Sequence, residues 1–265
     1  MTGIIGGSIM VGAILWNQYS FSALFLLITI MSMREFYAWC KKDHLAPQVL
    51  PGIISGAVVF ICFSFFMDFL PPGILLLLLP LVYSIFIREL YTNSEKPFQN
   101  IAITILGIVY LAVPMALINL ISQSAFNSDY SGYHPHIVLG YFFLVWASDI
   151  GAYFVGKNFG KMKLFERISP NKTWEGSIGG MLSGLLVAWL LSMNFADLRL
   201  VDWICISIIV VVTGTLGDLV ESLFKRSIHI KDSGHVLPGH GGFLDRFDAI
   251  FISAPFVFVY LQLMH

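Results

Sequence analysis

The sequence has 265 residues, of which 57% are hydrophobic and only 12% are charged, with a formal net charge of −1. This balance excludes an ordinary soluble domain and indicates an integral membrane protein. The three cysteines, Cys40, Cys62 and Cys205, lie far apart and form no CxxC pair. Neither a zinc knuckle nor a disulfide framework is therefore indicated.

Nine apolar runs follow one another along the chain, and each is a candidate membrane helix. A helix needs about 20 apolar residues to cross a bilayer, and shorter runs are tolerated at helix ends or where the bilayer is thinned. The expected segments are Thr2 to Leu15, Phe21 to Trp39, Val49 to Leu70, Ile74 to Ile87, Ile101 to Ile121, Ile137 to Val155, Trp174 to Met193, Val201 to Leu216, and Ala249 to Met264. We therefore predict an all-α fold: a polytopic membrane helix bundle of about nine transmembrane helices, forming a single domain over residues 1–265.

The basic residues predict the orientation of this bundle. If the N-terminus is cytoplasmic, every Lys and Arg except Arg199 falls on the cytoplasmic side, as the positive-inside rule requires. We expect a multi-pass protein of the cell inner (plasma) membrane. On the outer side, His134 and His136 lie in a polar loop. Two histidines without further ligands make a poor metal site, so we interpret this segment as a solvated loop.

Charged residues concentrate in the stretch from Asp218 to Asp248. Asp218 and Glu221 are three residues apart and Lys225 follows four residues later, so a helix places all three on one face. Asp245 and Asp248 are also three residues apart. Two acidic faces joined by a glycine-rich loop could bind a divalent cation through oxygen ligands. Nearby bases could hold phosphate oxygens: Lys225, Arg226, Lys231 and Arg246. The alternative is a set of ion pairs on a solvated loop.

Two earlier segments add to this group of charges. Asp149 is predicted to be a buried acid of the sixth helix, with Tyr153 on the same face, although the small residues around it also suit close helix packing. The loop from Lys157 to Thr173 is basic, and Ser169 followed by Pro170 predicts a helix N-terminus that could bind phosphate beside Lys172. Attraction to lipid headgroups is the competing explanation for this basic loop.

These motifs together resemble a known family. The run Ser222-Leu-Phe-Lys225-Arg226, then Lys231-Asp232, then Pro238-Gly-His240-Gly-Gly-Phe-Leu-Asp245-Arg246-Phe-Asp248 resembles the signature of the phosphatidate cytidylyltransferases, also called CDP-diacylglycerol synthases. Ser148-Asp149, Ala152-Tyr153 and Gly156-Lys157 are similar to a second family segment, and Ser169-Pro-Asn-Lys172-Thr-Trp-Glu-Gly176 to a third. Family members usually begin with a short basic segment that is absent here, so we expect a late or truncated start.

The resemblance implies that phosphatidate attacks the α-phosphorus of CTP, with Mg²⁺ required, at the cytoplasmic helix ends. It implies Asp218 and Asp245 as metal ligands, with Glu221 and Asp248 as supporting or second-metal groups. The implied catalytic and phosphate-binding bases are Lys225 and Arg226. The implied substrate-binding residues are Asp149, Tyr153, Lys157, Ser169, Lys172, Lys231, His240 and Arg246. His240 could donate to a phosphate or only shape the glycine loop.

Expected partners are CTP, phosphatidate and the lipid bilayer, with no nucleic acid; the oligomeric state stays open, with a homodimer as one alternative. Two other functions also stay open. A related lipid kinase or nucleotidyltransferase acting on a polyprenol or ether lipid would also bind a metal ion through carboxylates and phosphates through basic residues. A transporter would also contain buried acids, but it predicts charges along the middle of the membrane helices rather than at their ends.

Overall fold

A computed structural model describes residues 2–42, 45–65, 72–123, 132–230 and 242–264. The chain divides into two compact units, which are described separately. The first unit comprises Met1–Leu120 and Ser227–Phe247, and the second comprises Ile121–Arg226 and Asp248–His265. Both units are therefore built from two separate parts of the sequence. The prediction of a single domain over residues 1–265 stays a prediction.

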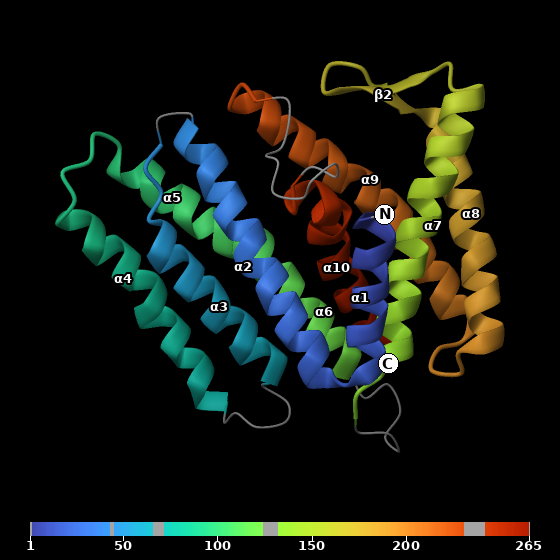
Figure 1. Cartoon of the computed structure of the whole chain (residues 1–265), viewed down its shortest axis with the longest axis horizontal. Coiled ribbons are helices and arrows are strands. Elements are labelled where there is room, and N and C mark those ends of the chain that lie inside the picture. The colour runs from blue at the N-terminus through green and yellow to red at the C-terminus, as the bar shows by residue number, and fades with distance from the viewer. Residues whose placement is uncertain (1, 43–44, 66–71, 124–131, 231–241, 265) are drawn as a thin grey trace. The chain divides into compact units, whose positions relative to one another are not determined.

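The first unit is a set of antiparallel helices (Figure 1). Its elements are α1 (Thr2–Trp16), α2 (Gln18–Lys42), α3 (Val49–Phe65), a 3₁₀ turn η1 (Pro72–Leu77), α4 (Leu78–Leu90), α5 (Pro97–Gly107), a π-helical turn η2 (Ile108–Ala112) and α6 (Val113–Gln123). Helix α2 packs against α3 and α5 through Tyr37, which is fully buried. The Tyr37 hydroxyl donates to the Thr104 carbonyl over 2.7 Å. Its ring fills the space that a side chain at Gly52 or Gly107 would need.

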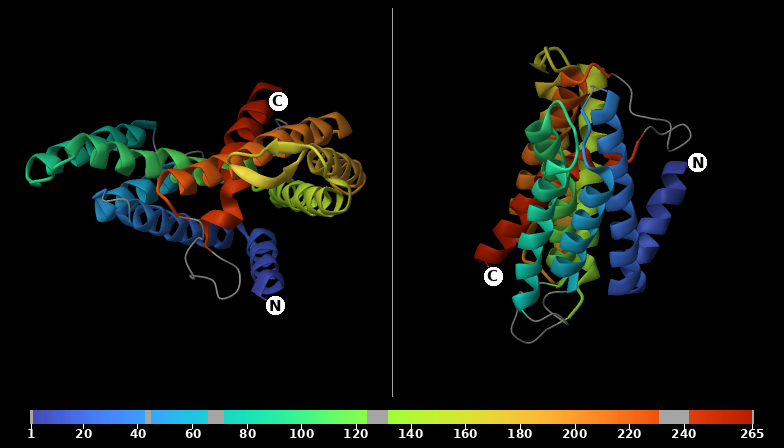
Figure 2. Two further views of the ribbon diagram at one scale, coloured as in Figure 1. Left: turned by 90° about the horizontal axis from the view of Figure 1, so that it is seen from above. Right: turned by 90° about the vertical axis from the view of Figure 1, so that its left-hand side faces the viewer.

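The second unit contains α7 (Pro135–Phe159), a hairpin of β1 (Lys163–Phe165) and β2 (Ser169–Thr173), α8 (Trp174–Asn194), α9 (Leu200–Ser227) as far as Arg226, and α10 (Leu244–Met264) from Asp248 onward, whereas the first turn of α10 belongs to the first unit. Helices α7 and α8 lie side by side in both views and are joined by the hairpin (Figures 1 and 2). Ser183 donates to the Ala147 carbonyl over 2.9 Å, and a side-chain carbon at Gly180 would come within 2.9 Å of the Ser148 carbonyl. Small residues let the two helices approach, as the sequence suggested for this segment.

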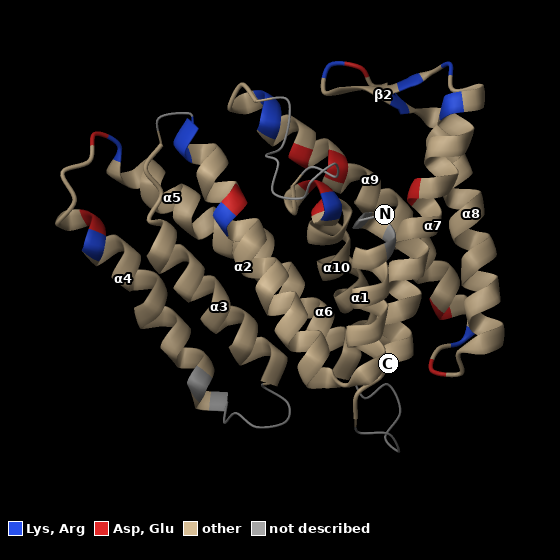
Figure 3. Cartoon of the chain, in the orientation of Figure 1, with Lys and Arg blue, Asp and Glu red and all other residues tan. Residues whose placement is uncertain are grey.

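The predicted polytopic all-α fold is confirmed. Of the described helices, six are long and apolar enough to cross a membrane: Gln18–Lys42, Pro97–Gln123, Pro135–Phe159, Trp174–Asn194, Leu200–Ser227 and Leu244–Met264. The other three expected segments are also helical, with shorter apolar helices in the first and third. Lys, Arg, Asp and Glu gather toward helix ends and connections (Figure 3). Within the second unit, Lys163 lies at the hairpin end of α8 and Arg199 follows its opposite end.

One local prediction was wrong. Ser169 and Pro170 do not begin a helix: they belong to β2, where Ser169 pairs with Phe165. Helix α8 begins at Trp174, and Thr173 is its N-cap, with its hydroxyl accepting from the Gly176 N–H over 3.2 Å. Strand pairing fixes Ser169, and Pro170 needs no hydrogen-bond partner for its nitrogen. A threonine closer to the apolar run therefore provides the cap.

The histidine segment is also more ordered than predicted. Asp197, in the connection between α8 and α9, contacts His134 Nδ1 at 3.2 Å and His136 Nδ1 at 3.4 Å. The His134 and Asp197 side chains are each only 17% exposed. The segment is thus held to the far end of α8 and α9 rather than freely solvated.

Candidate active site

The predicted acidic face of α9 is present, because the helix continues past the apolar run to Ser227. Glu221 is only 5% exposed. Its carboxylate pairs with Lys225 one turn later, at 3.2 Å between Oε2 and Nζ. One turn earlier, Asp218 is half-buried and faces a residue from the hairpin. Each of these two carboxylates therefore has a lysine partner.

Lys172 is the hairpin residue that reaches this face. Its ammonium forms an ion pair with Asp218 and donates to the Thr215 carbonyl over 3.3 Å. Lys172 and Asp218 are each about a quarter exposed. The pair therefore ties the end of β2 to α9 while leaving part of both groups accessible to a ligand.

Asp248 of α10 lies against the same face of α9. Close approach is allowed by Gly217, where a side-chain carbon would come within 2.5 Å of the Asp248 carbonyl oxygen. The Asp248 carboxyl contacts that of Asp218 and interacts electrostatically with Glu221, and its Oδ1 accepts from the Ala249 N–H over 2.8 Å. Two neighbouring carboxylates repel each other when both are ionised, so a cation bound beside them, in addition to Lys172, would relieve this repulsion.

Asp149 completes the group from α7. Its carboxyl interacts electrostatically with Asp218 and with Lys172, so the sequence prediction that these regions converge is correct. The Asp149 side chain is exposed at the surface of the chain, within a candidate membrane span, and its burial by the bilayer stays a prediction. One turn on, Tyr153 is 60% exposed, and its hydroxyl lies 3.3 Å from Lys157 Nζ. The neighbouring small residues Gly151 and Ala152 face α8.

We call these residues the carboxylate cluster: Asp149, Asp218, Glu221 and Asp248 with Lys172 and Lys225. Four acids meet two bases, which favours binding of a further cation. Among the described residues, no three His, Cys, Asp or Glu side chains stand ready to ligate one ion. Mg²⁺ is commonly held by one or two carboxylates, with water and substrate phosphates supplying the remaining ligands. The contacting pair Asp218 and Asp248 fits that requirement.

The remaining predicted residues fall outside this cluster. Arg226 is exposed near the end of α9, and Ser169 is part of the hairpin. Asp245 and Arg246 lie in the first turn of α10 and belong to the first unit. Lys231 and His240 lie outside the described residues. The metal role predicted for Asp245 and the phosphate roles of these bases stay predictions.

Glu35 is a buried acid that the sequence analysis did not identify. Glu35 of α2 is 6% exposed, and its Oε2 accepts from the backbone N–H groups of Phe243 at 2.7 Å and Leu244 at 3.2 Å. These groups form the N-terminus of α10, whose partial positive charge favours an anion. The sequence could have indicated Glu35, because an acidic residue inside an expected membrane segment is a candidate functional residue.

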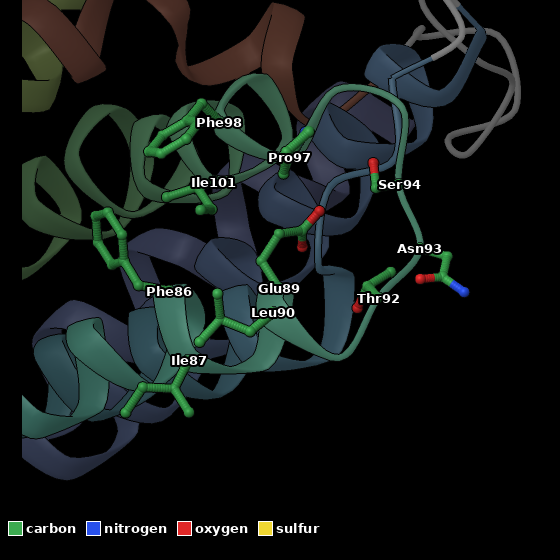
Figure 4. A pocket seen from close by; sticks show the side chains of 10 residues that line it. All are labelled: Phe86, Ile87, Glu89, Leu90, Thr92, Asn93, Ser94, Pro97, Phe98 and Ile101. Atoms are coloured by element: carbon green, nitrogen blue, oxygen red, sulfur yellow. The ribbon is translucent and has the colours of Figure 1, made fainter.

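A pocket of about 460 Å³ in the first unit contains none of the predicted site residues. It lies between α4 and α5, with Phe86 and Phe98 on its walls (Figure 4). Its acid, Glu89, accepts from Gln48 Nε2 at 2.6 Å and from Asn100 Nδ2 at 3.2 Å. These amides satisfy the buried carboxylate, so we assign Glu89 a structural role.

Comparison with known proteins identifies the family. A model of the cytidylyltransferase family matches residues 1–264. Three similar proteins are each named phosphatidate cytidylyltransferase. That of Bacillus subtilis strain 168 is 31% identical, over 99% of this chain and 96% of its own. Those of Staphylococcus saprophyticus subsp. saprophyticus and Rickettsia bellii are 33% and 35% identical, over 80% and 82% of this chain and 93% and 94% of their own. The resemblance noted in the motifs is thus confirmed, and the chain belongs to the cytidylyltransferase family.

Proposed function

We propose that this chain transfers the cytidylyl group of CTP to phosphatidate, giving CDP-diacylglycerol and pyrophosphate, and that the carboxylate cluster is its active site. The observation that carries this proposal is the convergence of Lys172 with Asp218 and Asp248, which come from three separate elements, β2, α9 and α10. The names of the similar proteins support the same reaction. Both substrates are polyanions, which suits a site that contains lysines and can take up a cation.

The reaction needs little acid–base chemistry from the protein. An oxygen of the phosphatidate phosphate attacks the α-phosphorus of CTP, and the bond from that phosphorus to the oxygen bridging to the β-phosphate breaks. Pyrophosphate leaves with the bond electrons. The attacking phosphate is already ionised near neutral pH, so the main barrier is the repulsion between two anions. Lys172 and Lys225 reduce this repulsion and stabilise the charge that develops on the leaving group.

We further propose that Mg²⁺ is the cofactor and that Asp218 and Asp248 hold it, with Asp245 as the additional ligand implied by the family motif. When bound, Mg²⁺ would neutralise phosphate charge and orient the leaving pyrophosphate. Glu221 keeps Lys225 in place through its 3.2 Å ion pair, and Lys172 holds Asp218 toward the hairpin. The protein residues thus position the charges before the substrates arrive.

The location of the cluster supports the proposed access to both substrates. Lys172 directly precedes α8, and Asp149 lies in the last three turns of α7, near the hairpin ends of two candidate membrane spans. A site there can receive a lipid from the bilayer and a nucleotide from water. We propose that this side is cytoplasmic and the membrane is the cell inner membrane, in line with the bias of basic residues. A homodimer is proposed as the oligomeric state to be tested.

The test is a lipid-extraction assay with purified protein in detergent and CTP labelled in the cytosine ring. Label should enter the organic phase only when phosphatidate and Mg²⁺ are both present, and EDTA should prevent this. Label with a polyprenyl or ether-lipid phosphate, but not with phosphatidate, would overturn the substrate assignment. If none of these lipids accepts the label, the enzyme assignment would be overturned and the transporter alternative would be favoured.

A further inference from the structure

The hairpin between α7 and α8 has an unusual surface for a short connection. Residues 160–173 join Phe159, where one candidate membrane span ends, to Trp174, where the next begins. A connection of this length between two spans lies at the level of the lipid headgroups, because the hydrocarbon core ends where the apolar helices end. The hairpin therefore faces lipid headgroups and water rather than acyl chains.

Large apolar side chains are exposed on and beside the hairpin. Phe159 is 69% exposed, Met162 65%, Phe165 47% and Trp174 53%. Side chains of this kind partition favourably into the boundary between headgroups and acyl chains. Their exposure is thus explained if this part of the molecule contacts the bilayer surface.

Three basic side chains stand among these apolar ones. Lys161, Lys163 and Arg167 are all exposed, and within the described part of the chain no carboxylate lies within ion-pair distance of them. Lys163 and Phe165 are two residues apart in β1, so they lie on the same face of the strand. Lys172 differs from these three, because it is engaged by Asp218.

We propose that this hairpin surface, formed by Lys161, Lys163 and Arg167 with Phe159, Met162, Phe165 and Trp174, binds anionic phospholipid at the bilayer surface and supplies phosphatidate to the carboxylate cluster. This rests on the proposed function. The charge is complementary to a phosphate headgroup, and each basic residue near an anionic surface strengthens attraction about fivefold at physiological salt. Lys172, near the end of β2, forms an ion pair with Asp218, so lipid held here is beside the cluster.

The test compares two charge-matched triple variants. The first is Lys161→Gln, Lys163→Gln and Arg167→Gln. The control is Lys41→Gln, Lys42→Gln and Lys96→Gln, which removes three basic residues that are also exposed but lie in the first unit. Turnover is measured in mixed micelles of uncharged detergent, varying the mole fraction of phosphatidate and, separately, the CTP concentration.

The hairpin variant should raise the KM for phosphatidate about 100-fold at physiological salt, because three roughly fivefold attractions are lost, with the KM for CTP and kcat within about twofold. High salt should raise the wild-type value toward that of the variant, because screening weakens the same attraction. The control variant should behave as wild type. An unchanged KM for phosphatidate, or an equal rise in the control, would overturn the proposal. A rise confined to the KM for CTP would instead assign the surface to nucleotide.

A binding measurement separates this proposal from the proposed function. Native mass spectrometry of the purified protein can count bound phosphatidate and phosphatidylcholine during titration in uncharged detergent. Wild type should bind phosphatidate about 100-fold more tightly than the hairpin variant, with no difference for phosphatidylcholine. That result would support the surface even if wild type failed to turn over phosphatidate, whereas equal phosphatidate binding in an active enzyme would refute the surface alone.

Discussion

The carboxylate of Glu35 accepts a hydrogen bond from the backbone N–H of Phe243 over 2.7 Å, across more than 200 residues of sequence. The same oxygen accepts from Leu244, the first residue of α10. The approach is so close that a side chain at Gly242 would overlap the Glu35 carboxylate. An anion from α2 thus caps the helix whose first turn carries Asp245.

Replacing Glu35 should loosen the start of α10. Glu35→Ala leaves two N–H groups without their charged acceptor, which should destabilise the protein by about 2 kcal/mol. Glu35→Gln keeps an acceptor and should cost less. Arg34→Gln is the matched control, since Arg34 is the exposed neighbour on the same helix. Thermal unfolding and turnover of purified protein are the measurements, and an Ala variant as stable as the Arg34 control would contradict the capping role.

Much of the fold was predictable because apolar length and charge bias are local properties of the sequence. The face shared by Asp218 and Glu221 also followed from helix spacing alone. The contact between Asp218 and Asp248 did not follow, because it depends on how closely α10 packs at Gly217. The sequence paired Asp218 with Asp245 by motif, whereas the structure supplies Asp248 as a direct neighbour.

The connection between α7 and α8 shows a second limit of sequence reasoning. Ser169 and Pro170 have the composition of a helix start, and only the pairing of Ser169 with Phe165 assigns them to a strand. Ser169 and Thr173 were both possible N-caps of α8, and the strand pairing of Ser169 leaves Thr173 as the cap. The same context brings Lys172 to Asp218, which spacing could not have predicted across 46 residues.

Asp218→Asn should lower turnover by about 100-fold or more, because it removes charge from the centre of the carboxylate cluster. The variant should still insert and purify, and Asp245→Asn should behave similarly if the motif assignment is correct. Asp197→Asn is a suitable control, as Asp197 lies at the opposite end of α8. Turnover is measured over a Mg²⁺ titration. Near-normal turnover in Asp218→Asn would contradict the assignment of Asp218 as a Mg²⁺ ligand.

The two competing helix caps can be distinguished by substitution. Thr173→Ala removes the acceptor of the Gly176 N–H and should destabilise the protein by about 1 kcal/mol. Thr173→Ser keeps the oxygen and should lose less. Ser169→Ala should have little effect, because Ser169 pairs within the hairpin through its backbone rather than capping a helix. Thermal unfolding of the three variants is the measurement. If Ser169→Ala destabilised the protein more than Thr173→Ala, Ser169 and not Thr173 would be the N-cap of α8.

Two glycines one turn apart on α9 test whether close packing sets the contact between Asp218 and Asp248. A side-chain carbon at Gly217 would meet the Asp248 carbonyl oxygen at 2.5 Å and the Ala249 Cα at 3.1 Å, both backbone atoms. At Gly214 the nearest atom is the Ala249 Cβ, at an ordinary 3.4 Å. Both substitutions to Ala raise helix propensity by the same amount, so any difference between them reports on packing.

Gly217→Ala should therefore push α10 away from α9, destabilise the protein by about 1–3 kcal/mol and lower turnover with a weaker response to Mg²⁺. Gly214→Ala should leave turnover near wild type and raise stability by up to about 1 kcal/mol, through helix propensity alone. Thermal unfolding and Mg²⁺-dependent turnover, measured on both variants side by side, give the comparison. If Gly217→Ala retained the wild-type Mg²⁺ response, the contact between the two carboxyls would not be what holds the cation, and Asp218 would have to act with another ligand.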